Sequence, residues 1–349
     1  MGYRYSGLVV GGIAALAVAA CGRADTSAGD EPPSTQGAPH LEPPAASIAA
    51  IPAGYIHVPG GKMAHTDCVH EIPDGGSVDP QGNVTLHGKL VAHFDPCAHE
   101  TLRGKAITAA NVRGGVRADA NPNGPSWGGW VESSWAYAAT IQGMAEFNHM
   151  NSGNWVVPAA PTTNNNQIIY LFPSFQSSRV IVQPVLQWGA TSAGGTGVIG
   201  GPYWTYAAWV ETDGTFYHSQ GITVNAGDTL NGWMDLGDKL GANFDWWAIG
   251  GTDVTTGQGM GGAFWVAPAP FDTAQGGVLE VYGMTACSDF PATGFTVFGT
   301  PSLTQAGPTW STENFVSPTW YPSPNDGYNG PDCGFSVSAS AANGTSLVY

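Results

Sequence analysis

Ile181-Val-Gln-Pro-Val-Leu-Gln-Trp188 is an apolar stretch that alternates like a β-strand and yet carries two amides. Successive side chains of a strand point to opposite faces, so Gln183 and Gln187 share one face. The other face belongs to three apolar residues, Val182, Pro184 and Leu186. Burying an amide on a core-like strand costs free energy unless the amide forms a hydrogen bond or has a functional role. Because proline donates no backbone hydrogen bond, Pro184 predicts an edge strand or a bulge here.

Two further stretches repeat this pattern. In Val278-Leu-Glu-Val-Tyr282, Glu280 shares a face with Val278 and Tyr282, while Leu279 and Val281 face the opposite way. Trp209 and Glu211 also share a face of an apolar segment. Three strands that each present a polar or aromatic row on one side predict the floor of a cleft in a sheet.

The composition favours a rigid β protein. The 349 residues include 50 Gly and 26 Pro, which disfavour long helices, and only 10% are charged. The formal charge is −16, and from Ala120 onward the only basic residues are Arg179 and Lys239. Phosphate contacts need Lys and Arg, so we expect no nucleic-acid partner. In an acidic environment, protonation of carboxylates would reduce the charge repulsion on this surface. The negative charge is equally consistent with a role in solubility alone.

The N-terminus predicts export. Arg4 precedes an apolar run from Leu8 to Ala20, which is too short and too rich in Ala and Gly for a membrane span. Val18-Ala-Ala-Cys21 resembles a bacterial lipobox, in which Cys21 would become the lipidated first residue; an ordinary cleaved signal is the alternative. We therefore expect an exported protein, either a lipoprotein of the outer cell surface or secreted, that meets the membrane only through such a lipid anchor.

The other four cysteines predict disulfides. Export permits them, and we expect Cys68–Cys97 and Cys287–Cys333, since each pair stays within one region of the chain. Zinc is the alternative for the N-terminal cysteines, because histidines flank them: His65, His70, His93 and His99. A disulfide beside surface histidines fits an exported chain better, so we expect neither a metal nor another cofactor.

Composition shifts divide the chain into five parts. They are a signal peptide (1–21), a disordered linker (22–52), a small N-terminal β unit (53–120), a main domain (121–307) and a turn-rich tail (308–349). Within the main domain, short apolar or alternating runs recur between Gly, Pro and Asn, which predicts an all-β sandwich or barrel. There is no H-E-x-x-H or Walker motif, and His149 and His218 are the only histidines after residue 120.

Seven segments between about Ser133 and Thr304 resemble, in order, the eqolisin-type glutamic peptidases. Ile181-Val-Gln183 is similar to that family's I-L-Q strand, and Ala208-Trp209-Val-Glu211 to its A-W-Y-E. Val278-Leu-Glu280-Val-Tyr282 lies where the family has W-I-V-E-D-F. The remaining matches are Ser134-Trp-Ala136, Gly153-Asn-Trp-Val-Val-Pro158, Ile222-Thr-Val-Asn-Ala-Gly-Asp228 and Phe295-Thr-Val-Phe298. Gln187 departs from the pattern, because the family carries an Asp there.

The resemblance implies a bent, concanavalin-like antiparallel β-sandwich that cleaves polypeptides at acid pH. It implies that Gln183 and Glu280 are catalytic: Glu280 would deprotonate a shared water, and the Gln183 amide would donate to the oxyanion. Trp209 and Glu211 would orient the peptide, with Gln187 and Tyr282 as further substrate contacts. We expect an enzyme of this kind that is a monomer. The alternative for the pair is structural, with Gln183 and Glu280 satisfying each other across neighbouring strands.

Other readings of the whole chain stay open. One is a non-catalytic cell-surface sandwich that binds glycans or proteins, and another is a glycan hydrolase using Glu211 and Glu280. Residues 53–120 are either a prosegment or a permanent accessory unit. As a prosegment, their basic end (Arg103, Lys105, Arg113 and Arg117) would lie on the acidic main domain and be released when carboxylates are protonated.

Overall fold

The computed structural model describes residues 51–103, 129–141, 143–177, 179–191, 199–240, 243–268, 270–324, 328 and 330–349. These all fall within one compact unit, Ala46–Tyr349. The predicted signal peptide, the lipidation site Cys21, nearly all of the predicted linker and the basic residues Lys105, Arg113 and Arg117 lie outside the described residues.

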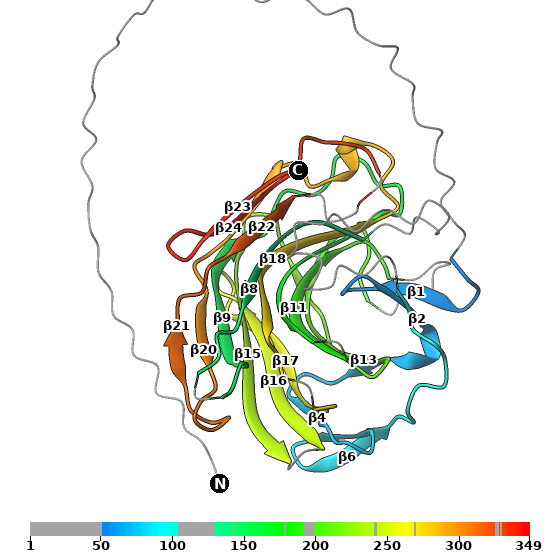
Figure 1. Cartoon of the computed structure of the whole chain (residues 1–349). Helices are drawn as coiled ribbons and strands as arrows, with labels where there is room; N and C mark the ends of the chain where they lie inside the picture. The colour runs from blue at the N-terminus through cyan, green and yellow to red at the C-terminus, as the bar shows by residue number, and fades with distance from the viewer. Residues whose placement is uncertain are drawn as a thin grey trace, which may run out of the picture. The chain divides into compact units, whose positions relative to one another are not determined.

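Two nine-stranded sheets make up the body of the fold (Figure 1). The first sheet has the order β22 (Tyr321–Pro324), β8 (Gly129–Tyr137), β18 (Thr273–Tyr282), β10 (Ile168–Gln176), β11 (Val180–Trp188), β12 (Trp204–Thr212), β13 (Thr215–Ser219) and β3 (Val69–Ile72), with β14 (Ile222–Val224) also paired to β12. The second has the order β21 (Asn314–Val316), β20 (Ser302–Gln305), β9 (Phe147–Val156), β15 (Thr229–Leu240), β16 (Phe244–Asp253), β17 (Gln258–Val266), β4 (Gly76–Val78), β5 (Asn83–Leu86) and β6 (Lys89–His93).

Two small sheets and two short 3-10 helices complete the fold. One small sheet joins β1 (Tyr55–Val58), β2 (Lys62–His65) and β7 (Leu102–Arg103); the other joins β19 (Phe295–Phe298), β24 (Gly344–Val348) and β23 (Ser336–Ser340). The 3-10 helices span Thr66–Cys68 and Cys287–Asp289, and the part of the chain that the structure describes contains no α-helix. No helix there is long and apolar enough to span a bilayer. The predicted all-β sandwich is confirmed.

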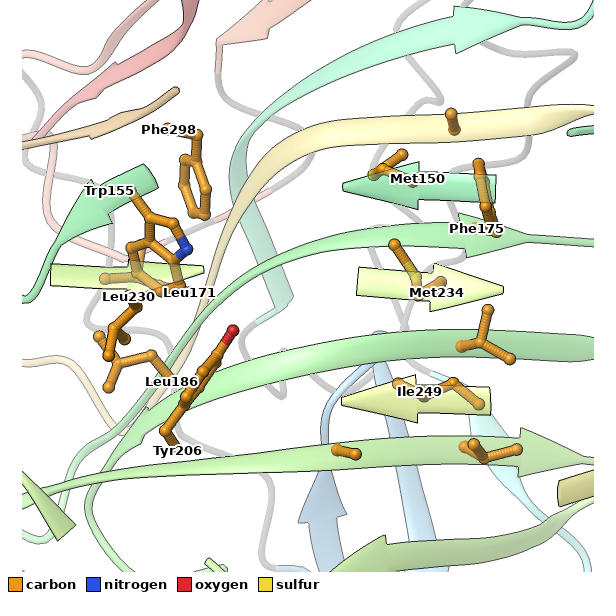
Figure 2. Close-up of a cluster of buried hydrophobic side chains, with 14 of the residues drawn as sticks. Met150, Trp155, Leu171, Phe175, Leu186, Tyr206, Leu230, Met234, Ile249 and Phe298 are labelled. Atoms are coloured by element: carbon orange, nitrogen blue, oxygen red, sulfur yellow. The ribbon is translucent and has the colours of Figure 1, made fainter. Parts of the chain in front are cut away.

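The main core lies between the two large sheets (Figure 2). Leu171, Leu186 and Tyr206 come from the first sheet, and Leu230, Met234 and Ile249 come from the second; all six are buried. Val182, Leu279 and Val281 belong to the same cluster, so the strand faces predicted for β11 and β18 are confirmed. Alternation then places Gln183 and Glu280 on the face of the first sheet that points away from the second sheet. We call this the site face.

The site face is covered rather than open. A second apolar cluster combines site-face residues, among them Ile181, Trp209 and Tyr282, with Ile56, Val58 and Ala64 of β1 and β2. The two strands are antiparallel and form a hairpin whose register pairs Val58 with Lys62. The tip, Pro59-Gly60-Gly61, is where the hairpin reaches the polar residues of the site face.

The prediction of an edge or bulged strand at Pro184 was wrong for β11 as a whole, because β11 lies between β10 and β12 in the middle of the sheet. The pairing of β10 with β11 is interrupted between Leu171↔Leu186 and Phe175↔Val182. That interval holds Pro173 opposite Pro184. Neither proline has an N–H to donate. Because they lie opposite each other, they interrupt the hydrogen bonding between β10 and β11 at a single place.

The N-terminal unit and the tail are parts of the sandwich. β3 pairs with β13 and β4 pairs with β17, both in parallel, so the sheets are mixed rather than purely antiparallel. β22 of the tail pairs with β8. The disulfides Cys68–Cys97 and Cys287–Cys333 form as predicted, with Cα–Cα distances of 5.0 and 5.5 Å. Two disulfides fit an oxidising environment.

Candidate functional site

Three strands bring the predicted site residues to one face. Gln183 lies on β11, Glu211 on β12 and Glu280 on β18, and all three are buried. The strand β10 runs between β18 and β11, and its Tyr170 is the cross-strand partner of Glu280. Gln183 and Glu280 are therefore not on neighbouring strands, although they lie on the same side of the sheet.

The Glu280 carboxylate receives four hydrogen bonds, two of them from the hairpin tip. Backbone N–H groups of Gly60 and Gly61 donate to it over 2.8 and 3.0 Å. The Trp130 indole N–H donates over 2.9 Å, and the Tyr282 hydroxyl over 2.5 Å. Gly60 and Gly61 have φ of +105° and +75°, a left-handed conformation that favours glycine and turns successive N–H groups toward one anion.

Burial dominates the acidity of this carboxyl. The side chain of Glu280 has no exposed surface, and burial raises its pKa from 4.5 to about 7 against the four hydrogen bonds, which lower it. Burial and the Glu280 charge also raise the pKa of Tyr170 and of Tyr282 well above its usual range, so both hydroxyls keep their protons. The Tyr282 hydroxyl can donate to ionised Glu280 and accept from protonated Glu280, so the contact suits either state.

Gln183 also faces the hairpin tip. A Cβ placed on Gly60 would lie 3.8 Å from Gln183 Nε2 and 3.5 Å from the side chain of Ile181. The Oε1 atom of Gln183 is buried without a hydrogen-bond partner among the described residues. The alternative in which Gln183 and Glu280 satisfy each other is thus contradicted, because every hydrogen bond that Glu280 accepts comes from another residue. One glycine contacts the carboxylate and lies against the amide.

A buried ion pair fixes the second strand of the hairpin. Lys62 Nζ contacts Glu211 Oε2, and the two side chains are 7% and 2% exposed. On the sheet, Glu211 is flanked by Ile181 of β11 and Phe216 of β13, two apolar residues. A buried carboxylate in such surroundings is stable as an anion only beside a cation. In this structure the hairpin supplies that cation.

The remaining predicted contacts differ in position. Trp209 is the cross-strand partner of Gln183 and packs in the apolar cluster under the hairpin, with its ring 4.7 Å from that of His218. Gln187 is engaged elsewhere: its Nε2 donates to the carbonyls of Gly189 and Ile199 over 2.7 and 3.0 Å. These bonds hold the connection after β11, and neither of them joins Gln187 to Glu280 or the hairpin tip.

Sequence reasoning missed the residues that the hairpin and β8 contribute. His57 stacks on Tyr282 at 3.7 Å, and the Tyr170 hydroxyl donates to its carbonyl over 3.1 Å. Burial lowers the pKa of His57 to about 3, so its ring is neutral. The available signals were the Pro-Gly-Gly turn at 59–61, which is typical of a hairpin, and Trp130 beside a glycine pair.

The histidines near the first disulfide form a separate cluster. Ligand atoms of His65, Asp67 and His99 lie within 4.8 Å of one another, and the two imidazole rings stack at 3.6 Å. Cys68 and Cys97 are bonded to each other, so neither offers a thiolate to the zinc site that was the alternative. This cluster is half-buried to exposed, and its members make none of the Glu280 contacts. The expectation of a metal-free protein stays a prediction.

Comparison with known proteins gives a remote likeness. No protein-family model and no curated protein sequence matches the chain. Two crystal structures of scytalido-glutamic peptidase, one with a transition state analog inhibitor and one with a peptide based transition state analog, are similar to it. Their TM-scores are 0.39 and 0.38; in both cases the identity is 14%, and the alignment covers 64% of this chain and 98% of the peptidase chain.

Proposed function

We propose that the chain is a glutamic endopeptidase in which Gln183 and Glu280 activate water for peptide-bond hydrolysis. The observation that carries this proposal is the position of Gly60 next to both side chains: its N–H donates to Glu280 over 2.8 Å, and a Cβ placed on it would lie 3.8 Å from Gln183 Nε2. A buried carboxyl with a raised pKa and a buried, incompletely bonded amide at one place are typical of a functional site.

The chemistry requires the hairpin tip to withdraw. A water and a substrate carbonyl would then take the place of the Gly60 and Gly61 N–H groups. Ionised Glu280 removes a proton from the water, which attacks the carbonyl carbon. The NH₂ group of Gln183 donates to the oxyanion of the tetrahedral intermediate. Protonated Glu280 then gives its proton to the leaving amine, which restores the carboxylate.

An acid optimum fits this scheme only in the uncovered state. Under the hairpin the pKa of Glu280 is about 7, because burial disfavours its charge. Once water reaches the carboxyl, part of that desolvation is lost and the pKa falls toward its ordinary 4.5. The uncovered enzyme therefore has an ionised base at mildly acid pH. Casein hydrolysis at pH 3–5 that resists pepstatin and is abolished by Glu280→Gln is the test.

Release of the hairpin at low pH needs a different group. Since the covered state holds the Glu280 proton more tightly than the uncovered one, acidification favours the covered state through this group alone. This is opposite to the release expected of a prosegment. We therefore do not assign acid release of the hairpin to Glu280.

A non-catalytic surface protein is the second candidate, and one observation favours it. β3 and β4 are built into the two large sheets, so residues 53–103 are well anchored for a segment that would leave. N-terminal sequencing after acid incubation separates the readings: a new N-terminus near 100–125 supports a prosegment, and an intact chain supports a permanent unit. Glycan pull-down by the intact chain would support the binding role.

We also propose export as a surface lipoprotein through Cys21, with a polypeptide as substrate and a monomeric state.

A further inference from the structure

The hairpin tip makes the kind of contacts that a bound peptide would make. Its two N–H groups lie on Glu280, and the next side chain, Lys62, enters the sheet beside Glu211. Both members of the ion pair are almost completely buried. In a peptidase with this dyad, a segment that contacts the carboxylate through its backbone and inserts a side chain nearby occupies the positions of substrate.

The main domain has no cation of its own to replace Lys62. Its only basic residues after Ala120 are Arg179 and Lys239. Arg179 pairs with Asp213 at the surface, with 2.5 Å between Nη2 and Oδ2. Lys239 pairs with Glu146 at 2.7 Å and with Asp245 at 3.6 Å. When the hairpin withdraws, Glu211 stays on an apolar part of the site face, where a basic side chain of a bound ligand can take the place of Lys62.

We infer that Glu211 is the base of a specificity pocket for a lysine or arginine side chain of the substrate, and that the β1–β2 hairpin is a tethered substrate mimic occupying it. This inference rests on the proposed peptidase function, because only a peptidase would have a peptide substrate. The pocket itself is defined by the Lys62–Glu211 pair. Its apolar walls come from the cluster that includes Ile181, Trp209 and Phe216, which suits the methylene stem of Lys or Arg.

The position of the pocket fixes where the basic residue lies in a cleaved peptide. Glu280 contacts the nitrogens of Gly60 and Gly61, which precede Lys62 in the chain. Since Glu280 protonates the leaving amine, the nitrogen of the cleaved bond lies where one of these two nitrogens lies. The basic residue is therefore on the leaving-amine side, two or three residues after the bond.

Binding tests the pocket without hydrolysis. In the full-length mature protein, Lys62→Met removes the ammonium and keeps the apolar stem, so the hairpin no longer neutralises Glu211. Calorimetry would compare the capped peptide Val-Pro-Gly-Gly-Lys, which copies residues 58–62, with a version carrying norleucine in place of lysine. We expect the lysine peptide to bind at least tenfold more tightly, and Glu211→Gln in the same background to reduce this ratio to about one. Equal binding of the two peptides, or binding of neither, would overturn the pocket.

A second background keeps the test valid if Lys62→Met does not fold. Gly60→Ala loosens the tip through its left-handed backbone conformation, and the same two peptides can be compared with and without Glu211→Gln. Mass spectrometry of a digested peptide library supplies the cleavage test: wild type should enrich Lys and Arg two or three residues after the bond, and Glu211→Gln should not. Selective binding without any hydrolysis would retain the pocket and refute the peptidase; hydrolysis with equal binding would do the reverse.

Discussion

The backbone N–H of Gly60 donates to the carboxylate of Glu280 over 2.8 Å, although 220 residues separate them in the chain. This bond joins the first strand pair of the fold to a fully buried carboxylate. The same turn lies against Gln183, and the residue that follows it pairs with Glu211 through Lys62. The state of the hairpin therefore controls all three polar residues of the site face together.

Loosening the tip should raise activity. Gly60→Ala forces alanine into a φ of +105°, which costs about 1–2 kcal/mol, while the new Cβ meets its neighbours only at ordinary contact distances. We expect the rate of peptide hydrolysis to rise about fivefold to thirtyfold, in proportion to the uncovered population.

Gly75→Ala is the matched control for this variant. Gly75 has a φ of +73° with no atom within 4 Å of a Cβ, so it carries similar strain away from the site. Its activity should equal that of wild type. Equal rates for Gly60→Ala and Gly75→Ala would show that the tip does not limit access.

Replacing Gln183 should lower the activity without lowering the stability of the folded chain. Its Oε1 is buried without a partner in the described part of the chain, so Gln183→Leu removes an unsatisfied atom and should leave the free energy of unfolding unchanged or raised by about 1 kcal/mol. Hydrolysis should fall about 10²- to 10³-fold through loss of the oxyanion donor.

Gln187→Leu is the contrasting variant on the same strand. It removes two hydrogen bonds to the carbonyls of Gly189 and Ile199 and should destabilise the protein by about 1–3 kcal/mol. Urea unfolding of both variants, together with peptide hydrolysis, checks this pair. A large loss of stability in Gln183→Leu would assign that residue to structure.

Stability should depend on pH through Glu280. Its folded pKa of about 7 exceeds the unfolded 4.5, so the folded state binds the proton more tightly. This contribution is complete below pH 4.5 and is lost as pH rises through 7, with an upper bound of about 3 kcal/mol. The difference in unfolding free energy between wild type and Glu280→Gln should change accordingly between pH 4.5 and 8. A difference that is flat with pH would mean that Glu280 is not desolvated.

The disulfide of the tail should stabilise the folded chain. Cys287 and Cys333 are 46 positions apart, and their bond limits the freedom of the unfolded chain. Replacing both with Ser should lower the unfolding free energy by about 2–4 kcal/mol. Thermal unfolding with and without reductant provides the check, since a reductant should lower the melting temperature of wild type by more than that of the double variant, which retains only the Cys68–Cys97 bond.

The sequence was sufficient for the strands and their faces. Alternation depends only on neighbours in the chain, so the strand expected over Ile181–Trp188 is observed as β11, Val180–Trp188. The burial of Val182 and Leu186 between the sheets, with Gln183 on the opposite face, follows from that period alone. The disulfide pairs were accessible for a similar reason, because each pair connects residues within one region.

The cover of the site was not accessible from the sequence. The hairpin reaches Glu280 across 220 residues, and no local pattern specifies which distant strand a turn will contact. The prediction of an edge or bulge at Pro184 was wrong because the effect of this proline depends on Pro173 of the neighbouring strand, a pairing that only the register shows. The hydrogen bonds of Gln187 were also not predictable from the sequence, because its two acceptors, the carbonyls of Gly189 and Ile199, lie in a loop with no strand pattern.

The most direct measurement is hydrolysis of casein at pH 3–5 in the presence of pepstatin, by wild type and by Glu280→Gln. Glu146→Gln serves as control, because Glu146 is a buried carboxylate paired with Lys239 rather than with the hairpin. We predict that wild type and Glu146→Gln cleave casein and that Glu280→Gln is slower by at least about 10³-fold while still folded. Equal cleavage by wild type and Glu280→Gln, or no cleavage by acid-treated wild type, would contradict the account.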